Sequence, residues 1–166
     1  QEICNQYDIL LVVDEVICGF GRTGNWFGSD TYNIKPDIIT MAKGITSGYI
    51  PLSGIMICDR VCETLINEGG EFYHGYTYSG HPVACAVSLE NLKIIKEENL
   101  IEQSRNVSVY LKQQMREIEK HPLVGEVRMK SFIGAVELVK DKETREMFKN
   151  TGTVGTICRD HCIENG

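Results

Sequence analysis

The sequence lacks a long hydrophobic run, an excess of positive charge and a recognisable leader segment. Its 17 Lys and Arg are outnumbered by 23 Asp and Glu, and a net charge of −6 disfavours nucleic acid or an anionic membrane surface as a partner. No apolar run approaches the roughly 18 residues of a membrane-spanning helix. The chain starts at Gln1 with no basic n-region, so no signal peptide is visible. We expect no nucleic-acid or membrane partner and a cytoplasmic location.

A disulfide framework is also missing. The seven cysteines are odd in number and irregularly spaced within apolar stretches, which indicates free thiols in a reducing compartment. Cys158, His161 and Cys162 form a cluster near the end of the chain, but no second pair of ligands follows at zinc spacing. The sequence therefore predicts no metal site.

The sequence does contain alternating strand and helix patterns. Its composition, 42% hydrophobic and 24% charged, is that of an ordinary globular protein. Short apolar runs indicate strands at 9–13, 37–41 and 53–58, and the first is apolar throughout, as in a strand covered on both faces. Apolar residues at helical spacing, or Gly and Pro residues at the ends of a segment, predict helices over 60–67, 83–98, 100–120 and 155–164.

These patterns predict an α/β fold with a mainly parallel sheet and flanking helices. Two β-rich runs between 124 and 139 are consistent with a hairpin or with adjacent strands. We expect residues 1–122 to be part of a large domain. Residues 123–166 would begin a smaller α+β domain.

A glycine run after the first strand imitates a dinucleotide-binding motif. Gly19-x-Gly21-x-x-Gly24 has the required spacing, and Asp37 follows at a plausible distance. The motif, however, needs a helix of ten or more residues after its third glycine, and only twelve residues, among them Gly28 and Pro36, separate Gly24 from Asp37. This mismatch disfavours a nucleotide-binding α/β module, which is kept as an alternative hypothesis.

Two polar side chains lie where ligands bind in α/β sheets. Asp14 follows the first predicted strand and Lys43 follows the second, and ligands occupy the carboxyl ends of such strands. Pyridoxal phosphate (PLP) requires both groups, a lysine for its aldehyde and a carboxylate for its ring nitrogen. Considered alone, Asp14 could be an acid that caps the next turn, and Lys43 could be a lysine in a solvated loop.

Several blocks of the sequence resemble the class III (ω-) aminotransferases, PLP-dependent enzymes of fold type I. The similar blocks are Asp14–Gly24, Lys35–Lys43, Ser47–Leu52 and His74–Pro82, with a weaker one at Gly134–Val139. The resemblance covers nearly the whole chain. It implies an internal part of a longer enzyme, with part of the PLP-binding large domain followed by the start of the small domain.

The resemblance also implies roles for individual residues. Lys43 would be the catalytic Schiff-base lysine, and Asp14 would pair with the ring nitrogen and raise its pKa. Val16 would pack on the ring if strand-like alternation continues past Asp14. Thr77 would donate its hydroxyl to the cofactor phosphate of a neighbouring subunit, which makes the active site a property of a homodimer. His74 and His81 are interpreted as structural.

The implied reaction is a ping-pong transamination from an amine or amino acid to a keto acid such as pyruvate. The tyrosine-containing blocks are most similar to the ω-amino acid and amine:pyruvate branch. The phosphate loop, the ring-stacking aromatic residue and the substrate-binding arginine of the family have no counterparts here. We therefore expect the 166-residue piece alone to bind PLP weakly and to turn over little. A catalytically silent fragment remains a further alternative.

Overall fold

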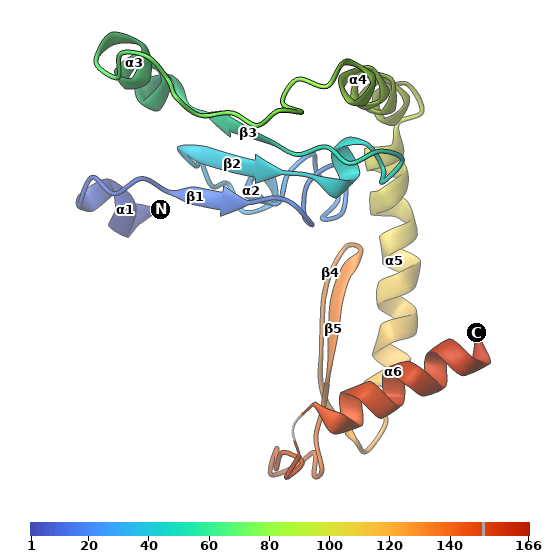
Figure 1. Cartoon of the computed structure of the whole chain (residues 1–166). Helices are drawn as coiled ribbons and strands as arrows, with labels where there is room; N and C mark the ends of the chain where they lie inside the picture. The colour runs from blue at the N-terminus through green and yellow to red at the C-terminus, as the bar shows by residue number, and fades with distance from the viewer. Residues whose placement is uncertain (151) are drawn as a thin grey trace. The chain divides into compact units, whose positions relative to one another are not determined.

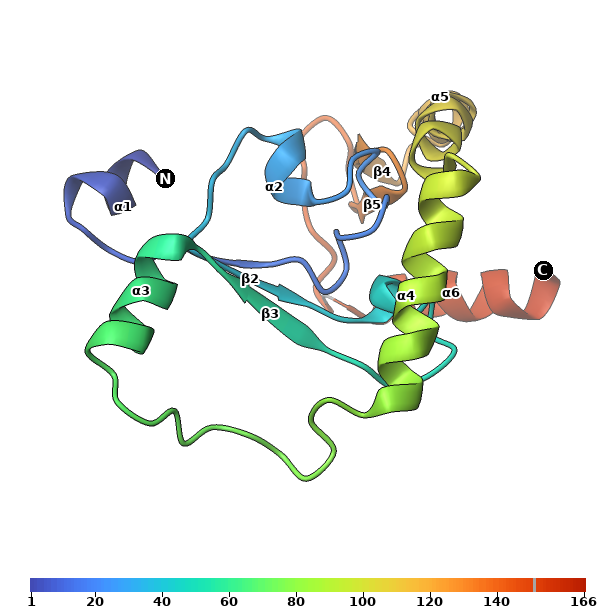
Figure 2. The ribbon, with the colours of Figure 1, turned by 90° about the horizontal axis from the view of Figure 1, so that it is seen from above.

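The computed structural model describes residues 1–150 and 152–166 (Figures 1 and 2). The chain divides into two compact units, residues 1–106 and 107–166, and each is described by itself. Among the described residues, no helix combines the length and the apolar character needed to cross a membrane.

The first unit contains a three-stranded sheet in the order β1-β2-β3 (Figure 1). Strands β1 (Val12–Asp14) and β2 (Ile38–Met41) are parallel, whereas β3 (Gly54–Ile57) runs antiparallel to β2. All three predicted strands are present, and the α/β class is confirmed. The antiparallel β3 was not expected, because an apolar run does not encode the direction of its strand.

The first strand differs from its prediction in length and in burial. It begins at Val12 rather than Ile9, and the N–H of Leu11 donates to the side chain of Asp37 (2.8 Å) instead of to a strand carbonyl. Val12 is 54% exposed. The expectation of a strand covered on both faces is therefore wrong for this structure, since the described helices leave part of this strand open.

Three helices of the first unit agree with the sequence patterns. They are α3 (Asp59–Asn67), α4 (Pro82–Glu97) and α5 (Leu100–Ile118), the last of which crosses the division between the units. Pro82 occupies the first turn of α4, where its missing N–H is not needed, and His81 Nδ1 accepts a hydrogen bond from the N–H of Ala84 (3.3 Å). His81 is thus a helix cap, consistent with its structural interpretation.

Three short helical segments were not predicted. They are α1 (Glu2–Gln6), α2 (Gly28–Thr31) and the 3₁₀ helix η1 (Lys43–Ile45). Each is five residues or fewer, so none spans enough turns to give a helical repeat in the sequence.

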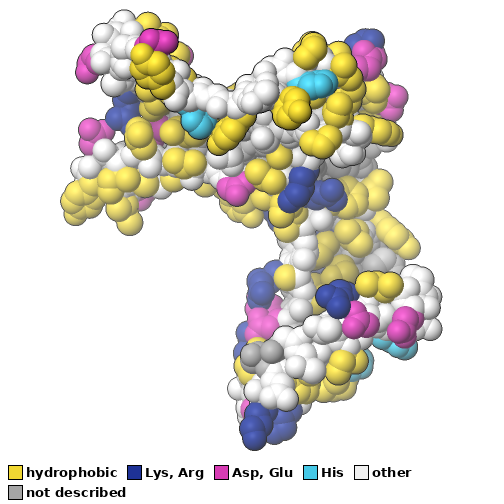
Figure 3. Space-filling model, in the orientation of Figure 1, with side chains coloured by type: hydrophobic (Ala, Val, Ile, Leu, Met, Phe, Trp, Pro, Cys, Tyr) yellow, Lys and Arg dark blue, Asp and Glu magenta, His cyan; other side chains and the backbone are white. Residues whose placement is uncertain are grey.

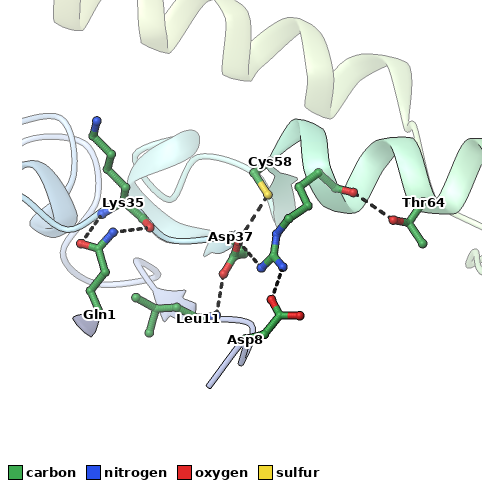
Figure 4. Close-up of polar contacts among 8 residues, drawn as sticks. Gln1, Asp8, Leu11, Lys35, Asp37, Cys58 and Thr64 are labelled. Carbon is green, nitrogen blue, oxygen red and sulfur yellow. Dashed lines mark hydrogen bonds and ion pairs between the residues drawn. The ribbon is translucent and has the colours of Figure 1, made fainter. Parts of the chain in front are cut away.

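A polar cluster ties the amino ends of β1 and β2 to α3 (Figure 4). Asp37 accepts hydrogen bonds from the N–H of Leu11 (2.8 Å) and from Arg60 (3.0 Å), and Arg60 also pairs with Asp8 (2.7 Å). These bonds lower the pKa of Asp37, the Leu11 N–H contributing most and Arg60 next. The cluster therefore fixes the end of the sheet opposite to the predicted ligand site.

The second unit contains a hairpin and a helix. Strands β4 (Val124–Lys130) and β5 (Ile133–Leu138) pair antiparallel, which selects the hairpin from the two arrangements that the sequence allowed. Val124 and Val139 are buried at its base. Helix α6 (Thr153–Asn165) follows, as its sequence pattern predicted.

Candidate active site

The parallel pair β1 and β2 brings Asp14 and Lys43 to one edge of the sheet. Asp14 is the last residue of β1 and is in register with Thr40 of β2. Lys43 begins η1, two residues after β2 ends at Met41. Both residues are exposed, so their side chains are accessible to a ligand at the carboxyl ends of the strands.

The carboxylate of Asp14 is held through one of its two oxygens. Its Oδ1 accepts a hydrogen bond from the hydroxyl of Thr40 (3.2 Å) and another from the N–H of Val16 (2.9 Å). Two donors on one oxygen fix the plane of the carboxylate and leave Oδ2 the oxygen suited to an incoming ligand. Thr40 therefore orients Asp14 from the neighbouring strand, a contact that no sequence pattern indicates.

Val16 is half-buried and lies in a turn, since β1 ends at Asp14. The strand-like alternation expected to align Val16 with Asp14 is therefore wrong, because the backbone turns after Glu15. The N–H of Val16 does contact Asp14, as described above. A role of the Val16 side chain against a cofactor ring stays a prediction.

Glu15 is a buried anchor that sequence reasoning missed. Its side chain is 1% exposed, and its carboxylate oxygens accept hydrogen bonds from the N–H groups of Gly28 (2.8 Å) and Ser29 (2.6 Å) at the start of α2. Its own N–H donates to the carbonyl of Thr40 (2.9 Å), which extends the parallel pairing by one residue. A buried carboxylate needs such partners, and here they fix the chain immediately after Asp14.

The backbone at Lys43 has an unusual conformation. Its φ is +44°, in the left-handed region that residues other than glycine seldom adopt. The turn is closed by two hydrogen bonds to the Lys43 carbonyl, from the N–H groups of Thr46 and Gly48 (both 3.2 Å). Thr46 is 1% exposed, and its hydroxyl donates to the carbonyl of Ile50 (2.8 Å). Residues in such conformations cluster at functional sites, which favours Lys43 as a functional residue.

Thr77 lies in an exposed turn over residues 77–80. The turn is closed by two hydrogen bonds, one from the N–H of Tyr76 to the hydroxyl of Ser79 (3.0 Å) and one from the N–H of Ser79 to the carbonyl of Tyr76 (2.9 Å). Nearby, His74 makes edge-to-face contacts with Phe72 and Tyr76. Among the described residues, no hydrogen bond or ion pair joins Thr77 to Asp14 or Lys43, and its predicted role toward a neighbouring subunit stays a prediction.

The glycine run contacts protein rather than presenting a phosphate cradle. The hydroxyl of Ser104 donates to the carbonyl of Gly21 (3.1 Å), and Arg105 Nε donates to the carbonyl of Gly24 (2.5 Å). The only helix between Gly24 and Asp37 in the described residues is α2, which is four residues long. Asp37 precedes β2 and pairs with Arg60, at the end of the sheet away from Asp14. The geometry gives the nucleotide-binding alternative no support.

Within the described part of the chain, no three His, Cys, Asp or Glu side chains gather closely enough to hold a metal ion. Cys158 and Cys162 are exposed free thiols on α6.

Proteins of known sequence resemble this chain along its whole length. A putrescine–pyruvate aminotransferase from Pseudomonas aeruginosa is 55% identical over 100% of this chain and 36% of its own length. A vanillin aminotransferase from Capsicum annuum is 41% identical over 100% of this chain and 37% of its own. The chain thus spans about a third of the length of the curated relatives that it matches.

Solved structures give the same result. A transaminase from a study of directed evolution by ancestral reconstruction matches with a TM-score of 0.95 and 48% identity, over 100% of this chain and 37% of its own. An (S)-enantioselective ω-transaminase from Thermomicrobium roseum matches with a TM-score of 0.84 and 51% identity, over 89% of this chain and 33% of its own. A family model described as aminotransferase class-III matches residues 1–163. The chain belongs to the class III aminotransferase family.

Proposed function

We propose that this chain carries the catalytic lysine of a PLP-dependent aminotransferase that moves an amino group from an amine or ω-amino acid to a keto acid such as pyruvate. Membership of a family that is generally PLP-dependent supports the reaction class. The observation that carries the proposal is the position of Asp14 and Lys43 after neighbouring parallel strands, at one edge of the sheet.

The residues present at this edge fit PLP. When bound, PLP supplies an electron sink that stabilises negative charge on the substrate carbon. Asp14 would hold the proton on the ring nitrogen, and its Oδ1 bonds to Thr40 and Val16 direct Oδ2 for this contact. Lys43 would hold the cofactor covalently through Nζ.

The chemical work of this chain would then rest on Lys43. Its exposed amine would act as the general base that takes a proton from the substrate carbon. The short, hydrogen-bonded turn from Lys43 to Gly48 keeps the point of attachment fixed while the long side chain moves. Val16 would pack beside the ring.

The names of two relatives support the substrate class that we propose. One of them acts on putrescine and pyruvate and another on vanillin, according to their names. An amine donor paired with pyruvate is the class we propose for this chain.

Three further proposals concern organisation. We propose a homodimer in which Thr77 of each subunit binds the cofactor phosphate of the other, and a cytoplasmic location. We also propose that a large-domain part ends at residue 122 and that a small domain begins at 123, after helix α5 has ended at Ile118. The exposed tyrosines near Thr77 provide apolar surface for such an interface.

The test is covalent trapping in the full-length protein that contains this sequence. Treatment with PLP and then borohydride should place a phosphopyridoxyl group on Lys43, located by peptide mass spectrometry. Lys43→Ala should abolish both the adduct and transamination, whereas Lys112→Ala, at an exposed lysine on α5, should change neither.

The variant Asp14→Asn separates the role of Asp14 toward the ring nitrogen from the covalent role of Lys43. This variant should still form the adduct on Lys43 but should slow turnover by orders of magnitude, because an amide cannot hold the ring nitrogen protonated. An adduct on another lysine, or full activity in Lys43→Ala, would contradict the proposal. Absence of any adduct would favour the catalytically silent alternative.

A further inference from the structure

The turn that carries Lys43 needs support from outside itself. Lys43 and Ser47 both have positive φ, +44° and +50°, although neither is glycine. Such conformations cost free energy and persist only where surrounding groups hold them. The support therefore has to come from residues that contact the segment between Lys43 and Ser47.

The side chain of Asn91, on α4, makes three hydrogen bonds to this segment. Its Nδ2 donates to the carbonyls of Gly44 (2.9 Å) and Ile45 (3.2 Å), and its Oδ1 accepts from the hydroxyl of Ser47 (2.7 Å). An amide side chain offers two N–H groups and one oxygen, so each kind of group is used. A single side chain thus binds three of the four residues that follow Lys43.

Helix α4 is itself a fixed element from which Asn91 can act. Ala84, Ser88 and Ile95 on this helix are 2%, 6% and 5% exposed. Asn91 follows Ser88 by three residues and precedes Ile95 by four, so it lies on the buried face. Figure 2 shows α4 beside the 3₁₀ segment that contains Lys43, in agreement with these hydrogen bonds.

The loop after β1 also lies close to this turn. A side chain at Gly44 would meet the Cβ of Phe20 at 3.0 Å and the carbonyl of Gly19 at 3.3 Å. Both this loop and the amide of Asn91 therefore contact the turn that carries Lys43.

We propose that Asn91 is a positioning residue for Lys43, which it acts on through the backbone of Gly44, Ile45 and Ser47. The inference rests on the proposed function of Lys43. Its consequence is that loss of the Asn91 amide should slow the chemistry of Lys43 in a protein that is still folded.

The experiment compares three variants of the full-length protein. Asn91→Asp keeps the size but removes the Nδ2 donors, Ser47→Ala removes one of the three bonds, and Glu97→Gln is a control at an exposed position of the same helix. The main measurement is the rate at which PLP added to the apoprotein forms a borohydride-reducible adduct on Lys43. It is made well below the melting temperature of each variant.

Asn91→Asp should slow adduct formation and kcat by roughly 10- to 100-fold with little change in KM, because misplacement of a reacting group by about 1 Å costs up to ~100-fold. Ser47→Ala should slow both by no more than about 10-fold, the equivalent of one hydrogen bond. Glu97→Gln should match the wild type.

The outcomes separate the two proposals. A wild-type protein without an adduct on Lys43 overturns the proposed function. A normal wild-type adduct together with wild-type rates in both Asn91→Asp and Ser47→Ala overturns the positioning role. A lower melting temperature with an unchanged rate of adduct formation overturns it as well, since it shows a purely structural contact.

Discussion

Residue positions at the site divide into those that a pattern can reveal and those that only tertiary contacts define. Asp14 and Lys43 could be predicted because each follows an apolar strand, and parallel strands bring their carboxyl ends together. Glu15 and Asn91 could not. Their partners lie 13 to 14 and 44 to 47 residues away, and neither has a local signal in the sequence.

The polar cluster around Asp37 gives a prediction about pH. Hydrogen bonds from Leu11 and Arg60 lower the pKa of Asp37 in the folded protein. A lowered pKa stabilises the fold above the unfolded value of about 3.9, and this contribution is lost as pH falls through the folded pKa. Asp37→Asn should therefore reduce the free energy of unfolding at neutral pH, and its deficit should shrink steadily below about pH 4.

Urea unfolding of wild type and Asp37→Asn between neutral and acidic pH would measure this difference. Glu97→Gln, at an exposed position, serves as a charge-matched control and should give a much smaller difference. A deficit in Asp37→Asn that does not change with pH would show that the carboxylate charge is not what stabilises the cluster.

At the scale of elements, the long helices and the hairpin were predictable and the short segments were not. α4 has a proline at its start, and α5 spans enough turns for its apolar spacing to be visible. β3 pairs antiparallel with β2, a direction that its apolar residues do not encode. η1 begins at Lys43, whose positive φ is a conformation that intrinsic propensity disfavours, so sequence reasoning misses this segment.

The glycine run from Gly19 to Gly24 has the spacing of a dinucleotide-binding motif, but the structure gives Gly21 a different role. Gly21 has a φ of +107°, and an added Cβ would approach Ile101 Cδ1 to 2.9 Å. Gly21→Ala should therefore destabilise the protein by about 1–3 kcal/mol in the absence of any nucleotide. Thermal or urea unfolding measures the loss.

Gly155→Ala is a matched control with the opposite expected sign. Gly155 lies within α6, and an added Cβ would meet no atom within 4 Å. Gly155 is the third residue of α6, so alanine there should stabilise the helix by at most about 0.5–1 kcal/mol, the cost of glycine in the middle of a helix. Equal stability of the two alanine variants would remove the structural explanation of Gly21.

At the scale of the whole molecule, much apolar surface is left open. Figure 3 shows many hydrophobic side chains at the surface. Near Thr77, the exposed fractions of Tyr73, Tyr76 and Tyr78 are 87%, 76% and 82%. Apolar surface on this scale marks a region that other protein covers, and because the chain spans about a third of its relatives' length, both further residues of a longer polypeptide and the second subunit of the proposed dimer are candidates to cover it.

The proposed sharing of the site predicts the effect of Thr77→Val in the full-length protein. Valine keeps the shape but lacks the hydroxyl, so PLP should bind the apoprotein about 10- to 100-fold more weakly, the value of a hydrogen bond to a charged group. The mass of the dimer, measured by light scattering, should not change. Tyr110→Phe, at an exposed hydroxyl on α5, is the control and should bind PLP normally.

Mixed dimers then decide whether Thr77 acts across the interface. If Lys43 of one subunit works with Thr77 of the other, a hybrid of Lys43→Ala and Thr77→Val subunits has one site with both defects and one site with neither. Random exchange should therefore restore wild-type PLP affinity and activity at about a quarter of all sites, since half of the dimers are hybrids. If each subunit supplied its own Thr77, every site would keep a defect and exchange would restore nothing, so a mixture no more active than its parents would refute the shared site.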